Sequence, residues 1–134
     1  MFKFIFPIIS IFFLSEAKSN QENPSPVLGD SLSRTITLID EERIGSNIYK
    51  NLQKSNYIVN NILVSDYISY LGNKLSRNIS RDRKYVFFVT KSNSVNAFAV
   101  PGGYIGLNAG LITLTENEAQ LAGVVAHELA HVVL

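Results

Sequence analysis

Both histidines of this chain lie in one short motif, His127-Glu128-Leu129-Ala130-His131. On a helix, residues four apart lie on one face about one turn apart, so two imidazoles at this spacing can bind one tetrahedral zinc ion. The glutamate after the first histidine lies ~100° round the helix, where its carboxylate can reach a water on that metal. The motif therefore predicts metal-assisted hydrolysis, with a peptide bond as the expected substrate.

A simpler interpretation is that the two histidines are hydrogen-bonded side chains of a buried helix. The context favours the metal site. The expected helix is long, capped and apolar, and burying an unpaired carboxylate costs several kcal/mol, which a metal and its water would offset. An extended segment and the turn Pro101-Gly102-Gly103 precede the motif, and together they form a natural edge for binding substrate.

The composition narrows the function classes. A chain of 134 residues with 46% hydrophobic and 17% charged residues is that of one folded domain. Its net charge of +1 gives no electrostatic reason to expect a nucleic-acid partner. The absence of cysteine excludes disulfides, thiolate zinc sites, a cysteine nucleophile and a lipid-carrying cysteine.

The first seventeen residues have the features of a secretory signal. Lys3 provides the positive charge, and Ser15-Glu16-Ala17 places small residues where a signal peptidase cleaves. The apolar run between them, Phe4 to Leu14, is too short to cross ~30 Å of hydrocarbon as a helix. We therefore expect an exported protein, periplasmic in a Gram-negative cell, with no stable membrane span after cleavage. The expected divisions are a signal peptide (1–17), a flexible leader (18–27) and a metallopeptidase domain (28–134).

The elements expected to position the motif indicate an α+β fold. Two scaffold helices, 40–54 with the stripe Ile44, Ile48 and Leu52, and 65–79 capped by Ser65, are expected behind a small sheet. The β-branched and aromatic segment 85–90 is expected to be a strand buried on both faces. Segments 95–100 and 104–107 are expected to form an antiparallel hairpin around the Pro-Gly-Gly turn.

The motif helix is expected to run from Glu116 to the end of the chain. Thr115 and Glu118 have the spacing of a capping box, in which each side chain bonds the backbone N–H of the other. The helix is apolar nearly all round, which is typical of a buried helix. Gly123, one turn before His127, leaves room for a substrate or another backbone to approach.

Two stretches carry a wider resemblance. Asn96-Ala97-Phe98-Ala99-Val100-Pro101-Gly102-Gly103-Tyr104-Ile105, followed by Ala126-His127-Glu128-Leu129-Ala130-His131, resembles the exported zinc metallopeptidases related to BepA and HtpX, over residues 28–134. The resemblance implies the N-terminal part of a gluzincin-like peptidase domain. It implies one Zn²⁺ per chain held by His127 and His131, with Glu128 as general base.

The same resemblance makes Asn96, Ala97, Phe98 and Ala99 the edge strand that binds an extended substrate. An ordinary strand with Phe98 in the core is the alternative. The implied function is endopeptidase quality control, with unfolded, stalled or outer-membrane proteins as substrates and no nucleic acid. A non-catalytic chaperone or assembly module that uses this edge strand, and a small exported domain without metal, are the competing hypotheses.

The chain departs from the pattern of that family at its end. The family uses a third zinc ligand, a glutamate in a Glu-x-x-x-Asp setting on a later helix. Here the sequence stops at Val132-Val133-Leu134, with no glycine, proline or basic last turn to end the helix. We therefore expect the N-terminal part of a longer protein, and an inactive truncated peptidase if the chain stands alone.

Overall fold

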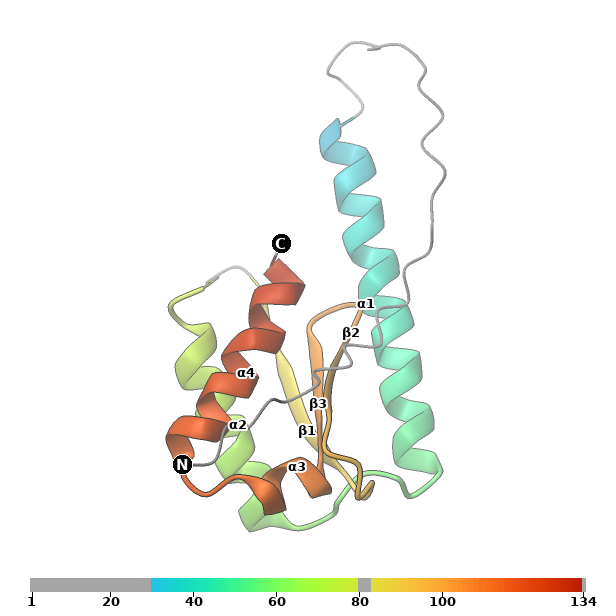
Figure 1. The fold of residues 1–134 in the computed structure, drawn as a ribbon. Coiled ribbons are helices and arrows are strands. Elements are labelled where there is room, and N and C mark those ends of the chain that lie inside the picture. Colours follow the sequence, from blue (N-terminus) through green and yellow to red (C-terminus); the bar gives the residue numbers. More distant parts are fainter. Residues whose placement is uncertain (1–29, 80–82, 134) are drawn as a thin grey trace.

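The computed structural model describes residues 30–79 and 83–133. The expected signal segment and leader lie outside these ranges. The described residues form a mixed α+β fold, as expected (Figure 1). The elements are α1 (Asp30–Lys54), α2 (Ile62–Ser76), β1 (Val86–Thr90), β2 (Ala97–Val100), β3 (Tyr104–Asn108), α3 (Ala109–Leu114) and α4 (Glu118–Val133). Within these ranges, no helix combines the length and the apolar character needed to cross a membrane.

The three strands form one sheet in the order β1-β3-β2. β1 runs parallel to β3, whereas β2 and β3 form the expected antiparallel hairpin. Its turn uses Gly102 and Gly103 at φ +88° and +85°, a left-handed backbone that glycine adopts without steric cost. The hairpin is continuous in register, and β2 lies at one edge of the described sheet.

Helices cover both faces of the sheet. On one face, the ring of Tyr49 from α1 lies 5.2 Å from that of Phe88, measured between centroids. On the other, Gly72 of α2 leaves room for the ring of Phe87. The expectation that both scaffold helices pack behind the sheet is therefore wrong. Successive β1 side chains point to opposite faces, and the first four are apolar, so each face needs its own helix (Figure 1).

The main core lies between the sheet and the pair α2 and α4. Burial of each large side chain there contributes about 1.5–3 kcal/mol. This packing holds α4 against the sheet. Helical periodicity predicts a stripe of Ile68, Leu71, Leu75 and Ile79 on the second helix; Ile68 and Leu71 are buried, whereas Ile79 is 37% exposed. The buried side chains include Ile68 and Leu71 of α2, Ile105 and Leu107 of β3, and Leu121, Val125 and Leu129 of α4.

α1 starts at Asp30, ten residues before the expected start at Asp40. Asp40 does not open the helix; its carboxylate accepts a bond from Arg43 at 3.0 Å on the helix surface. The expected apolar stripe is also wrong, because Ile44 and Ile48 are 46% and 38% exposed. The helix packs through Gly45 and Tyr49 instead, since only a glycine fits beside the Pro101 carbonyl.

α2 begins at Ile62 rather than at Ser65. The N-cap is Asn61, whose side-chain oxygen accepts hydrogen bonds from the backbone N–H of Leu63 at 3.0 Å and Val64 at 3.3 Å. Such caps satisfy N–H groups that have no partner inside the helix. Asn61 therefore adds one turn before the expected start and places Ser65 within the helix.

The region before the motif helix holds a short helix, α3, that the sequence did not predict. The expected capping box at Thr115 is wrong: its hydroxyl donates to the carbonyl of Ile112 at 2.8 Å and closes α3. α4 is capped two residues later, where the Asn117 oxygen accepts from the backbone N–H of Gln120 at 2.9 Å. The Gln120 oxygen in turn accepts from the backbone N–H of Glu116 at 2.8 Å.

Candidate metal and catalytic site

His127 and His131 lie one turn apart on α4, and their side chains converge. Their Nε2 atoms are 2.9 Å apart, and the two rings are 4.5 Å apart between centroids at 82° to each other. His127 is exposed and His131 is half-buried. The helix thus presents two ring nitrogens at one point of its surface.

This nitrogen pair fits a divalent metal. Two ligands at ~2.0–2.1 Å from a tetrahedral zinc lie about 3.3 Å apart, so a small rotation of either ring meets that geometry. Two neutral imidazoles can bond to each other only if one donates and the other accepts. A cation instead lets both nitrogens act as lone-pair donors. His127 and His131 are therefore candidate ligands.

The two histidines supply half of a four-ligand set. Among residues 30–79 and 83–133, no group of three or more His, Cys, Asp or Glu side chains is placed to hold a metal ion. Glu118, on the same helix, instead accepts a hydrogen bond from Tyr67 at 2.8 Å. Other donors would have to complete a tetrahedral ion here.

Glu128 lies between the two histidines in sequence and is buried, with 2% of its surface exposed. Burial raises the pKa of its carboxyl, and the charges of His127 and His131 lower it in part. A carboxylate with a raised pKa takes up a proton more readily, as a general base requires. α4 therefore brings a proton acceptor and two metal-ligand candidates together on one stretch of helix.

The expectation that α4 is buried nearly all round is wrong. Its buried residues are Leu121, Val125, Glu128 and Leu129, whereas His127 and Ala130 are exposed and His131 is half-buried. The buried residues share one stripe, and the histidines lie beside that stripe. The helix thus keeps one side for the core and leaves the metal-ligand side accessible.

β2 packs against α4, and among the described residues no further strand pairs with its outer edge. In an antiparallel pair, alternate residues bond the partner strand. The Asn96 carbonyl accepts from the backbone N–H of Asn108 at 3.0 Å, so Asn96 and Phe98 bond β3. By the same alternation, the N–H and C=O groups of Ala97 and Ala99 point away from β3.

The four expected substrate-binding residues therefore differ in the direction of their backbone groups: those of Asn96 and Phe98 bond β3, and those of Ala97 and Ala99 point away from it. The Phe98 ring lies on the opposite face of the sheet, 5.8 Å from that of Phe88 and over Gly106. Phe98 is half-buried there and lies outside the main buried core. A Cβ at Gly106 would overlap the rings of Phe98 and Phe88, so only glycine fits beneath them.

Comparison with known proteins identifies a family for the part of the chain that contains β2 and the motif helix α4. The model of Peptidase family M48 matches residues 62–134, which run from α2 through α4.

The chain belongs to peptidase family M48.

The resemblance noted in the sequence is thereby confirmed. This M48 chain is 35% identical over 109 residues to the putative beta-barrel assembly-enhancing protease of Vibrio cholerae, covering 80% of the chain and 22% of the relative. It is 32% identical over 120 residues to the beta-barrel assembly-enhancing protease of Escherichia coli K12, covering 89% of the chain and 25% of the relative. The Yersinia pestis protein of that name is 33% identical over 108 residues, covering 80% and 22%. The chain thus spans at most 25% of the length of these curated relatives.

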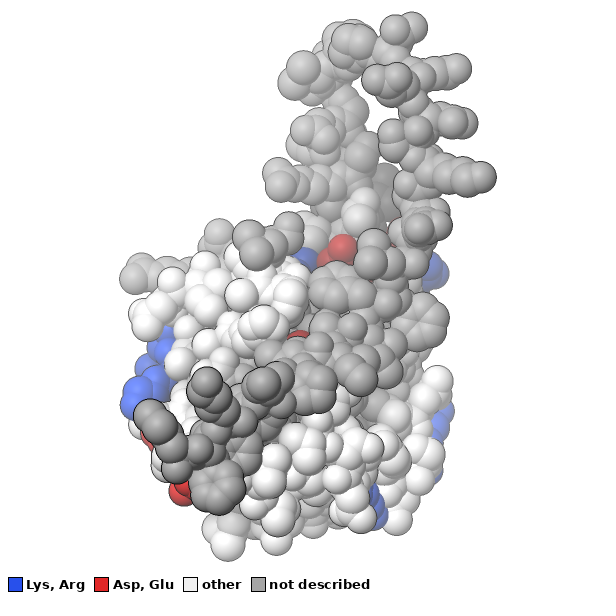
Figure 2. Space-filling view, viewed as in Figure 1, with Lys and Arg blue, Asp and Glu red and all other residues white. Residues whose placement is uncertain are grey.

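Gly123, one turn before His127 in the M48 chain, has room beside it among the described residues. Within the part of the chain that the structure describes, nothing lies within 4 Å of the position that a Cβ on Gly123 would take. Most described side chains on the face seen in Figure 2 are uncharged, with Lys and Arg toward its margins.

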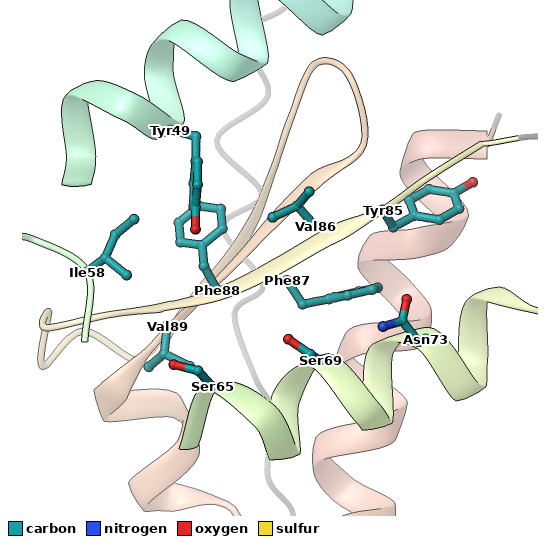
Figure 3. A pocket seen from close by; sticks show the side chains of 10 residues that line it. All are labelled: Tyr49, Ile58, Ser65, Ser69, Asn73, Tyr85, Val86, Phe87, Phe88 and Val89. Carbon is teal, nitrogen blue, oxygen red and sulfur yellow. The ribbon is translucent and has the colours of Figure 1, made fainter. Parts of the chain in front are cut away.

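A cavity of about 280 Å³ lies along β1, at the opposite edge of the sheet from β2 (Figure 3). Ser65, Ser69 and Asn73 of α2 line one side of it, and Tyr49 of α1 lines another. Sequence reasoning missed this cavity, although polar residues four apart on α2 were a signal for it. Neither histidine lines the cavity, so it is separate from the candidate site.

Proposed function

We propose that the full-length protein is a zinc-dependent endopeptidase, in which His127 and His131 bind the metal and Glu128 is the general base. The observation that carries this proposal is the 2.9 Å Nε2–Nε2 pair on a helix whose intervening glutamate is buried. Membership of peptidase family M48 supports it. The remaining ligands come from outside the described residues, and a glutamate on a later helix would give a gluzincin-like set.

Zinc, when bound, supplies a Lewis acid that lowers the pKa of water and polarises a carbonyl. Glu128 accepts the proton of the attacking water, because its burial raises the pKa of its carboxyl. It then donates that proton to the nitrogen of the leaving amine. Since Val125 and Leu129 anchor α4 in the core on either side of it, Glu128 keeps its place through both transfers.

The substrate is an extended polypeptide that pairs with β2. The outward N–H and C=O groups of Ala97 and Ala99 bond its main chain, and the packing of β2 on α4 brings that chain beside the histidines. Main-chain pairing does not read side chains. We therefore infer broad sequence tolerance, as a protease that acts on unfolded proteins needs.

The setting we propose is the cell envelope. The relatives are named for enhancing β-barrel assembly, and residues 1–17 have the features of a secretory signal. An exported, periplasmic enzyme that degrades misfolded or stalled outer-membrane proteins fits both observations. Polypeptides are then its partners, and nucleic acid is not.

The test compares Glu128→Gln with the parent in the full-length protein. We expect hydrolysis of dye-labelled casein to fall at least about a hundredfold, the scale of general-base catalysis, while one zinc per chain is retained. The matched control is Glu42→Gln, an exposed glutamate of α1. Undiminished hydrolysis in Glu128→Gln overturns the mechanism. A parent that binds casein without cleaving it supports the non-catalytic binding module instead.

A further inference from the structure

A buried polar pair joins the ends of β1 and β3. The Thr90 hydroxyl donates to the side-chain oxygen of Asn108 at 2.6 Å. The two residues are 0% and 6% exposed, so neither side chain has free access to water. The register pairs Thr90 with Asn108 on the same face as Phe88 and Gly106, the face covered by α1. The pair is thus on the opposite side of the sheet from the histidines.

Asn108 lies at a position where its side chain would be expected to cap a helix. It is the N-cap residue of α3, with the extended backbone of a cap (φ −74°, ψ 141°), yet its side chain makes no capping hydrogen bond. Asparagine at an N-cap usually accepts bonds from the first helical N–H groups. Here the side-chain oxygen accepts the Thr90 hydroxyl instead. The pair therefore holds Asn108 in a place that its local helix does not dictate.

The backbone of Asn108 continues this linkage to the substrate edge. Its N–H donates to the carbonyl of Asn96 at 3.0 Å, directly before β2 begins. At the other end of the loop, the Thr90 hydroxyl accepts from the N–H of Ser92 at 3.4 Å, and the Ser92 carbonyl accepts from Gly110 at 3.0 Å. The 91–96 loop is therefore fixed at both ends around one buried bond.

We propose that Thr90 and Asn108 are positioning residues for peptide binding: their hydrogen bond fixes Asn96, and so sets where Ala97 and Ala99 present their main-chain groups beside α4. The inference rests on the proposed function. Neither side chain touches the substrate, because both lie on the α1 face of the sheet. They act through the backbone of Asn108 and Asn96.

The experiment uses the full-length zinc-bound protein with Thr90→Val, which keeps the shape of the side chain and removes its hydroxyl. Thr90→Ser is the rescue variant because it restores the hydroxyl. Hydrolysis of dye-labelled casein gives KM and kcat, and fluorescence anisotropy in a Glu128→Gln background gives Kd. We expect Thr90→Val to raise KM and Kd about fivefold, the scale of one lost hydrogen bond, with kcat within about twofold of the parent. Thr90→Ser is expected to return both constants toward the parent.

A purely structural role for the pair gives a different result. Thr90→Val would then lower Tm but leave KM and Kd unchanged, and this outcome overturns the proposal. If Thr90→Val does not fold, Asn108→Ala tests the same bond, since it removes the oxygen that accepts the Thr90 hydroxyl and keeps the backbone N–H that donates to Asn96 at 3.0 Å. Unchanged Kd in that variant also overturns the proposal. If the parent binds casein without hydrolysing it, the proposed function is overturned but this proposal is not. The Kd of Thr90→Val for casein then still tests the role of Thr90 and Asn108.

Discussion

The Tyr67 hydroxyl donates a hydrogen bond to Glu118 at 2.8 Å, and this bond ties the middle of α2 to the first turn of α4. It complements the apolar core farther along α4. Glu118 was expected to cap its own helix; it instead fixes that helix to a neighbour. The direction in which α4 presents His127 and His131 thus depends on a polar contact as well as on the core.

Tyr67→Phe removes this contact while keeping the ring. We expect a loss of stability of about 0.5–1 kcal/mol at neutral pH, because the bond lies at the surface. The bond to Glu118 raises the pKa of Tyr67, with smaller contributions from desolvation and the Glu118 charge. A raised pKa means that the stabilisation is complete below the ordinary value of 10.0 and is lost as the pH rises through the raised value.

Thermal unfolding followed by circular dichroism between pH 7 and 11 checks this prediction. The matched control is Tyr70→Phe on the same helix, a more exposed tyrosine whose change should leave Tm nearly unaltered. Equal Tm values for the parent and Tyr67→Phe at pH 7 would contradict the proposed tie.

Gly72 and Gly123 are expected to respond to alanine in opposite ways. A Cβ at Gly72 would overlap the ring of Phe87, so α2 or β1 must shift, at a cost of about 1–3 kcal/mol. A Cβ at Gly123 meets nothing within 4 Å among the described residues, so Gly123→Ala should gain up to about 1 kcal/mol of helix propensity. Urea unfolding of both variants measures the two signs. A destabilised Gly123→Ala would show that another part of the protein packs against this position.

Ala99→Pro tests the outward face of β2. Proline removes the N–H that is expected to bond the substrate, and the ladder to β3 does not use that N–H. We expect KM for casein to rise about fivefold in the full-length protein, the scale of one hydrogen bond. Ala99→Ser is the control, since it keeps the N–H at this exposed position. Equal KM values for the two variants would argue against main-chain pairing at Ala99.

Metal removal tests the two proposed ligands. In the full-length protein, a chelator should abolish hydrolysis and lower Tm, because a metal that binds only the folded state stabilises it. His127→Ala and His131→Ala should each lack tight zinc binding, so the chelator should no longer change their Tm. Metal analysis that finds one zinc per chain in either variant would remove that histidine from the ligand set.

The sequence predicted correctly the features that local chemistry determines. The hairpin follows from alternating residues around Pro101-Gly102-Gly103, and the spacing of His127 and His131 requires only a helix. The buried stripe Ile68 and Leu71 follows from helical periodicity. Each of these features depends on residues that are close together in the sequence.

The predictions are wrong or incomplete where contacts between residues far apart in the sequence determine the structure. α1 turns Gly45 toward the sheet because the Pro101 carbonyl lies there, and nothing in residues 40–54 indicates that neighbour. Glu118 satisfies the spacing of a capping box, but the Tyr67 hydroxyl that it bonds lies 51 residues away in sequence. The burial of Glu128 is likewise a consequence of how α4 packs on the sheet and on α2, which the motif alone does not encode.

The position of β2 at the edge of the described sheet also affects how copies of the protein associate. Natural sheets protect exposed edges with charged residues or proline within the strand, because an unpaired edge pairs readily with another. Ala97-Phe98-Ala99-Val100 has no such residue. If β2 pairs with an extended substrate as proposed, the same edge can pair with that of a neighbouring copy. Association should then grow with concentration, and Ala99→Lys should suppress it.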